Sequence, residues 1–326
     1  MNARPHPTPL RSAGFSQGER RGAGAALALR YVLVGLGNIG QKRRAALGAQ
    51  CVATVDPFNP DADAREVGAI DPARYDAAIL SVPNDVKLEL MRALLAGGKH
   101  VLVEKPLVFS GAEDAEMLSR SAQRAGAMWY TAYNHRFEPL IQRLNQCISD
   151  GQIGEVYSAR LFYGNGTVSN VIGSFRDGGT GVVEDLGSHL LDLARFLFHT
   201  HEVPFRVESV LRQEASAPDH ATLRSEDGRI ALEMSFLSWK NTFTIDALGS
   251  RGSLHLDGLR KWGGSRLTVR ERVFPSGVPR ETVHEDIGID TTWADELRHF
   301  ETLVATGTSS FEGDRWISQT LDRVPV

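Results

Sequence analysis

Short apolar runs alternate with longer amphipathic stretches over the first third of the chain. The predicted strands are residues 30–35, 51–55, 77–82, 100–103 and 127–131. The predicted helices are residues 38–47, 85–96 and 111–125. Strands that alternate with helices over short connections predict a parallel sheet with helices on both of its faces.

The pattern changes after Glu138. One helix is expected up to Asp150, and turn signals such as Glu226-Asp227-Gly228 then separate consecutive strand-like segments. These strands are residues 156–163, 206–214, 221–224, 230–238, 242–247, 252–256 and 266–272, with helices at 183–198, 292–305 and 313–322. Consecutive strands on short turns predict a mostly antiparallel sheet.

Three regions follow from these patterns. Residues 1–29 are expected to form a disordered tail, and residues 30–137 an α/β Rossmann domain with a doubly wound parallel sheet. Residues 138–326 are expected to form an α+β domain with an open, mostly antiparallel sheet that binds substrate and supports oligomerisation. The length of 326 residues also favours two domains over a single core.

Charge and cysteine content exclude several classes of protein. The net charge of −4 at pH 7 provides no positive field for nucleic acid or an anionic membrane. Cys51 and Cys147 belong to no metal-ligand cluster, so neither a disulfide framework nor a structural metal site is predicted. No apolar run is long enough to cross a bilayer. We therefore expect a cytoplasmic protein without bound metal.

The first 29 residues allow a second interpretation. Arg20-Arg21 precedes an apolar stretch, as in a twin-arginine export signal. That stretch continues into Tyr31–Val34, which the sheet needs as its first strand, so cleavage there would remove or crowd the strand. A disordered tail or an over-long start site is the preferred interpretation.

Gly35-Leu36-Gly37-Asn38-Ile39-Gly40 is a complete GxGxxG motif. A glycine-rich chain can produce the motif by chance, but here it follows a predicted strand and opens a predicted helix. Gly35 would permit the tight turn, Gly37 the approach of a pyrophosphate, and Gly40 the packing of helix on strand. The helix start, with Asn38 and Ile39, would offer free N–H groups to the phosphates.

Asp56 ends the next predicted strand, twenty-one residues after Gly35. A carboxylate at this place accepts hydrogen bonds from the ribose hydroxyls of a dinucleotide and repels a 2′-phosphate. The sequence therefore favours NAD as the cofactor, with NADP less favoured.

Two further polar segments end predicted strands, at the edge of a parallel sheet where ligands bind. Ser81-Val82-Pro83-Asn84 could be only a turn, and Glu104-Lys105-Pro106 could be only a surface ion pair. Because both follow strands of the sheet that carries GxGxxG, we expect cofactor contacts there. The contacts are predicted for Ser81, Pro83, Asn84, Glu104 and Lys105.

A third polar segment begins with Gly178-Gly179-Thr180-Gly181 and continues with Asp185, His189 and Asp192. Offsets of four and three place these three side chains on one face of a predicted helix. These three side chains could simply form a solvated face of the helix. However, the preceding glycines would let the start of the helix approach a ligand. The neighbouring apolar stripe should be core: Leu186, Leu190, Leu193 and Leu197.

Together these motifs resemble the family of glucose–fructose oxidoreductase, inositol dehydrogenase and the rhizopine-catabolism proteins. The matches run in family order over about residues 30–200. They are Gly35–Gly40, Asp56, Ser81–Asn84, Glu104-Lys105-Pro106, Asn134-His135-Arg136-Phe137, Gly154 and the segment Gly179–Asp192. Thr180 departs from the family pattern, since it replaces the middle glycine of the usual run.

The resemblance implies an NAD(H)-dependent oxidoreductase that acts on a hydroxyl or keto carbon of a sugar, polyol, sugar acid or nucleotide sugar. By this likeness Lys105 binds and polarises the reacting oxygen, His189 exchanges the proton, and Asp185 orients substrate or histidine. Asn134 would lie beside the nicotinamide, and Arg136 beside nicotinamide or substrate. Because an open sheet face calls for a partner chain, a homodimer or homotetramer is expected.

Two other functions remain open. A regulator of the same fold would bind NAD without turnover, but such a protein would be expected to lose Lys105 or His189. An NAD-dependent glycosidase would oxidise its substrate only transiently, and no feature of the sequence excludes it.

Overall fold

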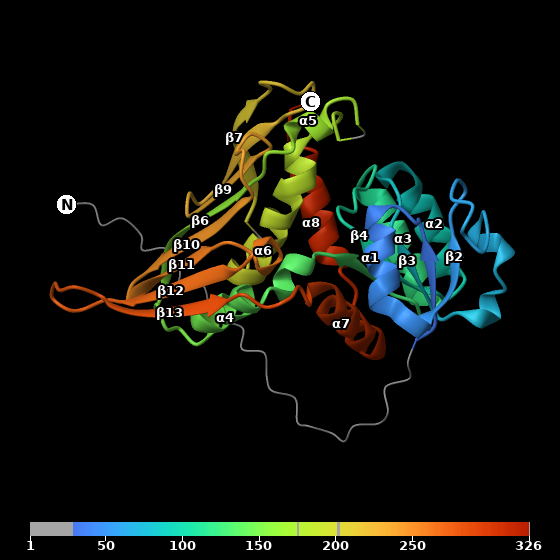
Figure 1. Cartoon of the computed structure of the whole chain (residues 1–326), viewed down its shortest axis with the longest axis horizontal. Helices are drawn as coiled ribbons and strands as arrows, with labels where there is room; N and C mark the ends of the chain where they lie inside the picture. The colour runs from blue at the N-terminus through green and yellow to red at the C-terminus, as the bar shows by residue number, and fades with distance from the viewer. Residues whose placement is uncertain (1–28, 175, 201–202, 326) are drawn as a thin grey trace, which may run out of the picture.

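The computed structural model describes residues 29–174, 176–200 and 203–325. The predicted tail and the possible export signal therefore lie, apart from Leu29, outside the described residues. Two sheets make up the two halves of the molecule, and α6 and α8 stand between them (Figure 1). Within the described ranges, no helix has the length and apolar character needed to cross a membrane.

The N-terminal half contains the predicted parallel sheet. Its five strands follow the order β2-β1-β3-β4-β5. They are β1 (Tyr31–Val34), β2 (Cys51–Val55), β3 (Ala77–Leu80), β4 (His100–Glu104) and β5 (Trp129–Ala132), and every adjacent pair is parallel. The apolar runs form strands here because both faces of the sheet are covered, which leaves β1 and β3 fully buried.

Helices cover this sheet on both faces. They are α1 (Asn38–Leu47), α2 (Asn84–Ala96) and α3 (Ala112–Arg124), each within a residue of its prediction. Met91 of α2 and Leu118 of α3 share one core cluster with alternate strand residues such as Val32. The other strand residues pack with Leu47 of α1 on the opposite face. The doubly wound Rossmann class is thus confirmed.

The chain returns to this sheet at its C-terminal end. Leu297 and Phe300 of α7 (Thr292–Thr306) complete the cluster around Leu33 on the α1 face. In α8 (Phe311–Leu321), Asp314 accepts a hydrogen bond of 2.8 Å from the indole N–H of Trp129 on β5. The prediction assigned both helices to the second domain, whereas they also pack against the first sheet.

The second sheet has eight strands in the order β13-β12-β11-β10-β6-β9-β8-β7. They are β6 (Val156–Gly164), β7 (Phe205–Leu211), β8 (His220–Ser225), β9 (Ile230–Ser235), β10 (Thr242–Gly249), β11 (Gly252–Asp257), β12 (Ser265–Glu271) and β13 (Arg280–Asp286). Only β6 and β9 pair in parallel, so the mostly antiparallel prediction is confirmed. The sequence did not predict β13, because this exposed edge strand is largely polar and lacks an apolar alternation.

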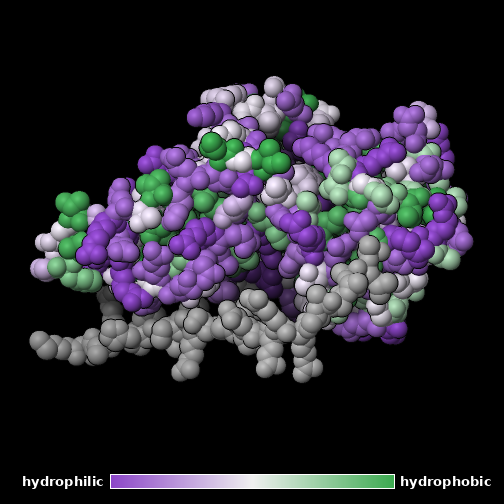
Figure 2. All heavy atoms as spheres, turned by 60° about the horizontal axis from the view of Figure 1, so that its bottom comes forward, coloured by the Kyte–Doolittle hydropathy of each residue, from purple (hydrophilic) through white to green (hydrophobic). Residues whose placement is uncertain are grey.

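One face of this sheet holds the core of the second half. It packs against α4 (Pro139–Ser149) and α6 (Ser188–Phe198), and the predicted leucine stripe is buried there. The opposite face carries polar pairs such as Arg160 with Glu233 and His255 with Asp246. Hydrophilic side chains also dominate the surface in Figure 2, which is hollowed where the two halves meet.

Candidate active site

The predicted catalytic residues meet at the junction of the two halves. Lys105 follows β4 in the first half, and Asp185 precedes α6 in the second (Figure 1). The Lys105 ammonium donates to Asp185 Oδ1 at 2.8 Å and to the Asp185 backbone carbonyl at 2.8 Å. This contact brings together two side chains that are eighty positions apart in the sequence.

A buried lysine of α2 supports the segment that carries Lys105. The Lys87 ammonium donates to the backbone carbonyls of Glu104 at 2.6 Å, Pro106 at 2.9 Å and Lys105 at 3.3 Å. Burial lowers the pKa of Lys87 to about 7. The three carbonyls thus surround an amine with little access to water, and the amine fixes the backbone from which Lys105 projects.

The segment that carries Asp185 is a π-helix rather than the predicted first turn of a continuous α-helix. Val183–Gly187 is π-helical, and the α-helix begins only at Ser188. A π turn leaves the i→i−4 ladder, and such turns are frequent at functional sites. Here the carbonyl of Asp185 accepts its bond from Lys105.

The glycines before this turn have a role that the sequence did not predict. Gly181 has φ +53, and a Cβ there would lie 2.3 Å from the carbonyl oxygen of Pro218. Only glycine fits this approach of two backbones. The glycines therefore let the chain before the π turn pack against the β7–β8 connection, whereas the sequence predicted that they would let the helix approach a ligand.

Asp185 is shared between two cations. Its Oδ2 lies 3.3 Å from the guanidinium of Arg176, while Oδ1 holds Lys105. Burial raises the pKa of Asp185, but Lys105 and Arg176 together bring it below its ordinary value. The ionised carboxylate can therefore orient the Lys105 ammonium at neutral pH.

His189 lies one helical turn beyond Asp185 and is only 7% exposed. Its ring stacks on that of His135, with centroids 4.0 Å apart, and Tyr133 and Tyr163 each lie 5.9 Å away. Burial, with His135 and nearby lysines, holds the pKa of His189 well below its usual range. The imidazole is therefore neutral at pH 7 and able to accept a proton.

Three neighbours of His189 were missed by sequence reasoning. His135 lay inside a matched motif but was given no role, and neither Tyr163 nor Lys261 follows a recognisable pattern. The Lys261 ammonium lies 3.0 Å from His135 Nε2 and 3.5 Å from the Tyr163 hydroxyl. Only the folding of β6 and the β11–β12 connection beside each other brings these side chains to the site.

Arg136 and Asp192 form an ion pair beneath the site. Two guanidinium nitrogens of Arg136 bind the two carboxylate oxygens of Asp192, which is 2% exposed. The row of Asp185, His189 and Asp192 is therefore not a solvated face. Arg136, for which a contact with nicotinamide or substrate was predicted, has Asp192 as its principal partner in the structure. Asn134 donates to the Thr292 hydroxyl of α7 at 3.1 Å.

The glycine loop has the shape that a dinucleotide requires. A Cβ on Gly40 would lie 1.9 Å from the Gly35 carbonyl oxygen, and one on Gly35, where φ is +91, would lie 2.3 Å from the Ser81 carbonyl oxygen. By contrast, nothing lies within 4 Å of a Cβ placed on Gly37. Asn38 and Ile39 form the start of α1 next to this open space. The loop therefore fits a bound pyrophosphate.

Asp56 is anchored beside that loop. Its Oδ2 accepts from the Leu36 N–H at 2.8 Å, and its Oδ1 accepts from the N–H groups of Phe58 and Asn59 at 2.9 Å each. These bonds lower the pKa of Asp56, so a fixed negative charge stands at the end of β2. Carboxylate oxygens accept more than one hydrogen bond, so ribose hydroxyls can still bind.

The remaining predicted cofactor residues connect the elements around the loop. Asn84 opens α2 just after Pro83, and its amide donates to the Glu184 carboxylate of the π turn. The side-chain hydroxyl of Ser81 is buried without a partner. Glu104 is bound at 2.7 Å by Arg43 of α1.

Arg43 is buried, with 1% of the residue exposed to solvent. It lies 2.7 Å from Glu296 of α7 as well as from Glu104, and 4.5 Å from the Trp293 ring centre. Burial raises the pKa of Glu296 to about 7. This network joins the helix of the glycine loop to the segment that carries Lys105.

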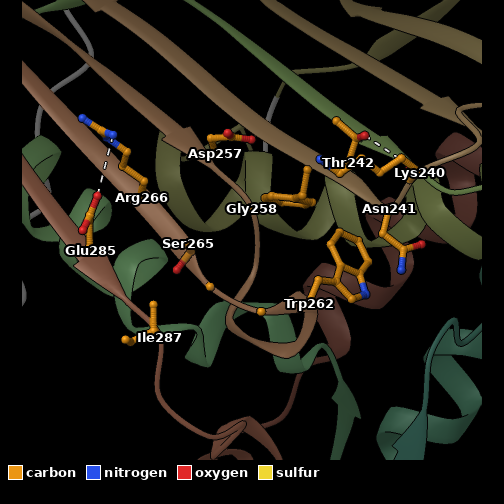
Figure 3. A pocket seen from close by; sticks show the side chains of 13 residues that line it. Lys240, Asn241, Thr242, Asp257, Gly258, Trp262, Ser265, Arg266, Glu285 and Ile287 are labelled. Carbon is orange, nitrogen blue, oxygen red and sulfur yellow. Dashed lines mark hydrogen bonds and ion pairs between the residues drawn. The ribbon is translucent and has the colours of Figure 1, made fainter.

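A polar hollow of about 410 Å³ lies between the start of β10 and the β11–β12 connection (Figure 3). Trp262 and Phe243 line it, and their rings lie 5.7 and 5.5 Å from that of Tyr163. The hollow therefore shares a wall with the candidate active site.

A parallel sheet with a glycine loop at the start of a helix, followed by a second domain, is typical of two-domain dinucleotide-binding proteins. Residues 29–133 match the model described as an oxidoreductase family with an NAD-binding Rossmann fold. Residues 141–255 match the GFO/IDH/MocA C-terminal domain. The chain belongs to the GFO/IDH/MocA family of oxidoreductases, which confirms the resemblance seen in its motifs.

Curated relatives share about half of their length with this chain. Inositol 2-dehydrogenase of Rhizobium meliloti (strain 1021) is 29% identical over 185 residues, which cover 52% of this chain and 55% of the relative. The scyllo-inositol 2-dehydrogenase (NADP(+)) of Bacillus subtilis (strain 168) is 28% identical over 163 residues, covering 49% of this chain and 45% of the relative.

Solved structures match the fold over nearly the whole chain. A levoglucosan dehydrogenase in complex with NADH has a TM-score of 0.77 and 20% identity, and the match covers 91% of this chain and 95% of that chain. An inositol dehydrogenase homologue from Azotobacter vinelandii, with NADH and myo-inositol, has a TM-score of 0.71 and 22% identity, with 91% and 96% covered. At these identities the likeness establishes the fold.

Proposed function

We propose that this protein is an NAD(H)-dependent dehydrogenase that moves a hydride between nicotinamide and a carbohydrate-like molecule. The substrate carbon bears a hydroxyl or keto group and belongs to a sugar, polyol, sugar acid or nucleotide sugar. The observation that carries this proposal is the Lys105–Asp185 contact of 2.8 Å, with His189 one turn further on, beside the dinucleotide-binding sheet.

The side chains of His189, Lys105 and Asp185 have different roles in moving the proton and stabilising charge. His189, neutral at pH 7, takes the proton of the substrate hydroxyl in oxidation and returns it in reduction. The Lys105 ammonium, held by Asp185, stabilises negative charge that develops on the substrate oxygen. Bound NAD supplies the hydride acceptor. The glycine loop and Asp56 would hold its pyrophosphate and ribose.

NAD is proposed as the preferred cofactor. The fixed carboxylate of Asp56 supports this choice, because it would repel a 2′-phosphate. Arg43 offers no compensating charge, since it is bound between Glu104 and Glu296. The names of the relatives support a sugar or polyol as substrate, and one of those names includes NADP(+).

A homodimer or homotetramer formed through the second sheet completes the proposal. The sheet face opposite α4 and α6 supports it, because no helix of the described chain covers that face (Figure 1). We also propose a cytoplasmic location, which the free thiols of Cys51 and Cys147 support.

The proposal is tested by following NADH absorbance with purified protein, NAD and a panel of sugars, polyols, sugar acids and nucleotide sugars. NADH formation with one substrate class is the expected result. NAD binding without turnover of any panel member would instead favour a regulator. Hydrolysis of a glycoside without net NADH would favour the glycosidase.

A further inference from the structure

Lys261 is a cation at the site without an anionic partner. It belongs to the short helical turn Arg260–Trp262 between β11 and β12. In the part of the chain that the structure describes, its ammonium contacts neutral groups: His135 Nε2 at 3.0 Å, the Tyr163 hydroxyl at 3.5 Å, and the rings of Tyr163 and Trp262. Among the described residues Lys261 forms no ion pair, and the residue is exposed to solvent.

The charge on Lys261 is close enough to the candidate active site to help lower the pKa values of His135 and His189. Burial of the ammonium among protein atoms lowers the pKa of Lys261 to about 8, Glu138 opposes this shift, and the charge of Lys105 adds to it. Lys261 is therefore still mostly protonated at pH 7. Lys105 and Arg176 share the carboxylate of Asp185, whereas Lys261 has no carboxylate within ion-pair distance among the described residues.

The neighbours of Lys261 leave two donors for a ligand. Since Lys261 donates to His135 Nε2, the proton of this neutral imidazole is on Nδ1, which is buried. Burial raises the pKa of Tyr163, so its hydroxyl keeps its proton while accepting from Lys261. One N–H of the ammonium and the phenolic O–H therefore remain free to donate.

We propose that the substrate carries a carboxylate, which Lys261 and the Tyr163 hydroxyl bind while the reacting carbon faces Lys105 and His189. This inference rests on the proposed dehydrogenase function and narrows its substrate to carbohydrate acids. The His135 ring, stacked at 4.0 Å on His189, separates the anion position from the proton acceptor by a single ring. The carboxylate is therefore a few bonds from the reacting hydroxyl.

The donor set suits a carboxylate better than a phosphate. A carboxylate has one negative charge and two acceptor oxygens, and one ammonium with one hydroxyl satisfies both. A phosphate has more charge and three terminal oxygens, which proteins usually match with several cations or a row of backbone N–H groups. The contacts of Lys261 include no such row.

Matched pairs of substrates test the inference. Turnover with NAD is measured for D-glucuronate against D-glucose and for D-gluconate against D-sorbitol, in the wild type, Lys261→Met and Lys261→Arg. Lys240→Met is the control, because Lys240 is an exposed lysine of the nearby hollow that has no contact with the catalytic residues. Binding of the same acids and of glucose 6-phosphate to the NADH-loaded proteins is measured by calorimetry.

The wild type should prefer each acid over its neutral partner. Lys261→Met should raise KM for the acids by about 10- to 100-fold, as expected for a lost hydrogen bond to a charged group, with kcat and the neutral partners changed less than about threefold. Lys261→Arg should restore part of the preference, and Lys240→Met should match the wild type.

Three results would overturn the inference. They are equal or better turnover of the neutral partners, tighter binding of the phosphate than of the acids, and an equal loss for acids and neutral partners in Lys261→Met. The last would mean that Lys261 only positions His135. Acid binding that depends on Lys261 without any NADH formation would support the anion site while counting against the dehydrogenase, so the two proposals fail separately.

Discussion

The Lys105 ammonium lies 2.8 Å from both Oδ1 and the backbone carbonyl of Asp185, so one side chain holds two groups of the other half of the molecule. This carbonyl belongs to the π-helical turn Val183–Gly187. One residue of this pair comes from each half of the chain. The candidate chemistry therefore depends on how the two sheets are held together.

Lys105→Met should lower kcat by at least about 100-fold, because it removes the charge that stabilises the developing alkoxide. Affinity for NAD, measured by calorimetry, should stay within about threefold of the wild type. Loss of NAD binding together with turnover would mean that Lys105 mainly supports the cofactor site. A melting temperature close to that of the wild type serves as the control for folding.

The pH dependence of oxidation should follow the base. His189 must be neutral to accept a proton, so kcat/KM should fall as the pH drops through its pKa, which burial places below 6.5. Above about pH 7 His189 is neutral, so its protonation should no longer limit kcat/KM there. His189→Ala should lower kcat and remove the acid-side inflection. The same inflection in the variant would assign it to another group, with His135 the first alternative.

Substitutions of two glycines in the loop, Gly37 and Gly40, should affect different properties, one mainly NAD affinity and the other mainly stability. Gly37→Ala places a methyl group in open space, so the free energy of unfolding should change by less than about 0.5 kcal/mol. NAD affinity should nevertheless fall at least about tenfold, since the methyl group blocks the pyrophosphate. Gly40→Ala should cost roughly 1–3 kcal/mol or more, because its Cβ meets the Gly35 carbonyl oxygen at 1.9 Å. Denaturant unfolding with calorimetric titration of NAD measures both effects, and unchanged NAD binding by Gly37→Ala would contradict the assigned phosphate site.

Asp56→Ala should raise KM for NAD. It should also reduce the ratio of kcat/KM for NAD to that for NADP by about tenfold, because one hydrogen bond to a charged group is lost. The variant also loses three hydrogen bonds from backbone N–H groups, one from Leu36 in the glycine loop and two from Phe58 and Asn59 in the loop that follows β2. Steady-state kinetics with both cofactors should therefore be paired with Asp63→Ala, which removes a neighbouring carboxylate bound to Thr54. If the ratio of the two cofactors is unaltered by Asp56→Ala, this carboxylate does not bind the ribose.

Glu296 should make stability depend on pH. Its pKa in the folded protein, about 7, lies above its ordinary value of 4.5, so its stabilising contribution is complete below about pH 4.5 and is lost as the pH rises through 7. Relative to Glu296→Gln, which mimics the protonated acid, the wild type should lose on the order of 3 kcal/mol between pH 5 and 8. Urea unfolding across that range measures the difference, and parallel curves for the two proteins would show that Glu296 does not titrate there.

The order of elements was predictable because the apolar runs are short and fully buried. Tyr31–Val34 and Ala77–Leu80 are apolar throughout, as strands covered on both faces must be. The edge strand β13 has no such apolar run, because most of its side chains are exposed to solvent. The π turn at Val183–Gly187 also escaped prediction, since apolar spacing does not distinguish one π turn from an α turn.

Only part of the candidate site was visible in the sequence. Lys105, Asp185 and His189 stand in motifs, and the structure brings Lys105 and Asp185 into contact. Lys261 and Tyr163 belong to neighbouring parts of the second sheet, and their meeting at His135 depends on strand register. A local pattern does not contain such long-range pairing.

The packing of α7 and α8 has a consequence for synthesis on the ribosome. Phe300 covers Tyr31 and Leu33, and Asp314 binds Trp129, so the first sheet stays partly uncovered until α7 and α8 have emerged. A nascent chain that ends before Thr292 would expose this apolar surface for as long as the second half is being translated. Folding of the dinucleotide half is thus coupled to the translation of α7 and α8, and chaperones that bind apolar surface would be expected to act before these helices have been made.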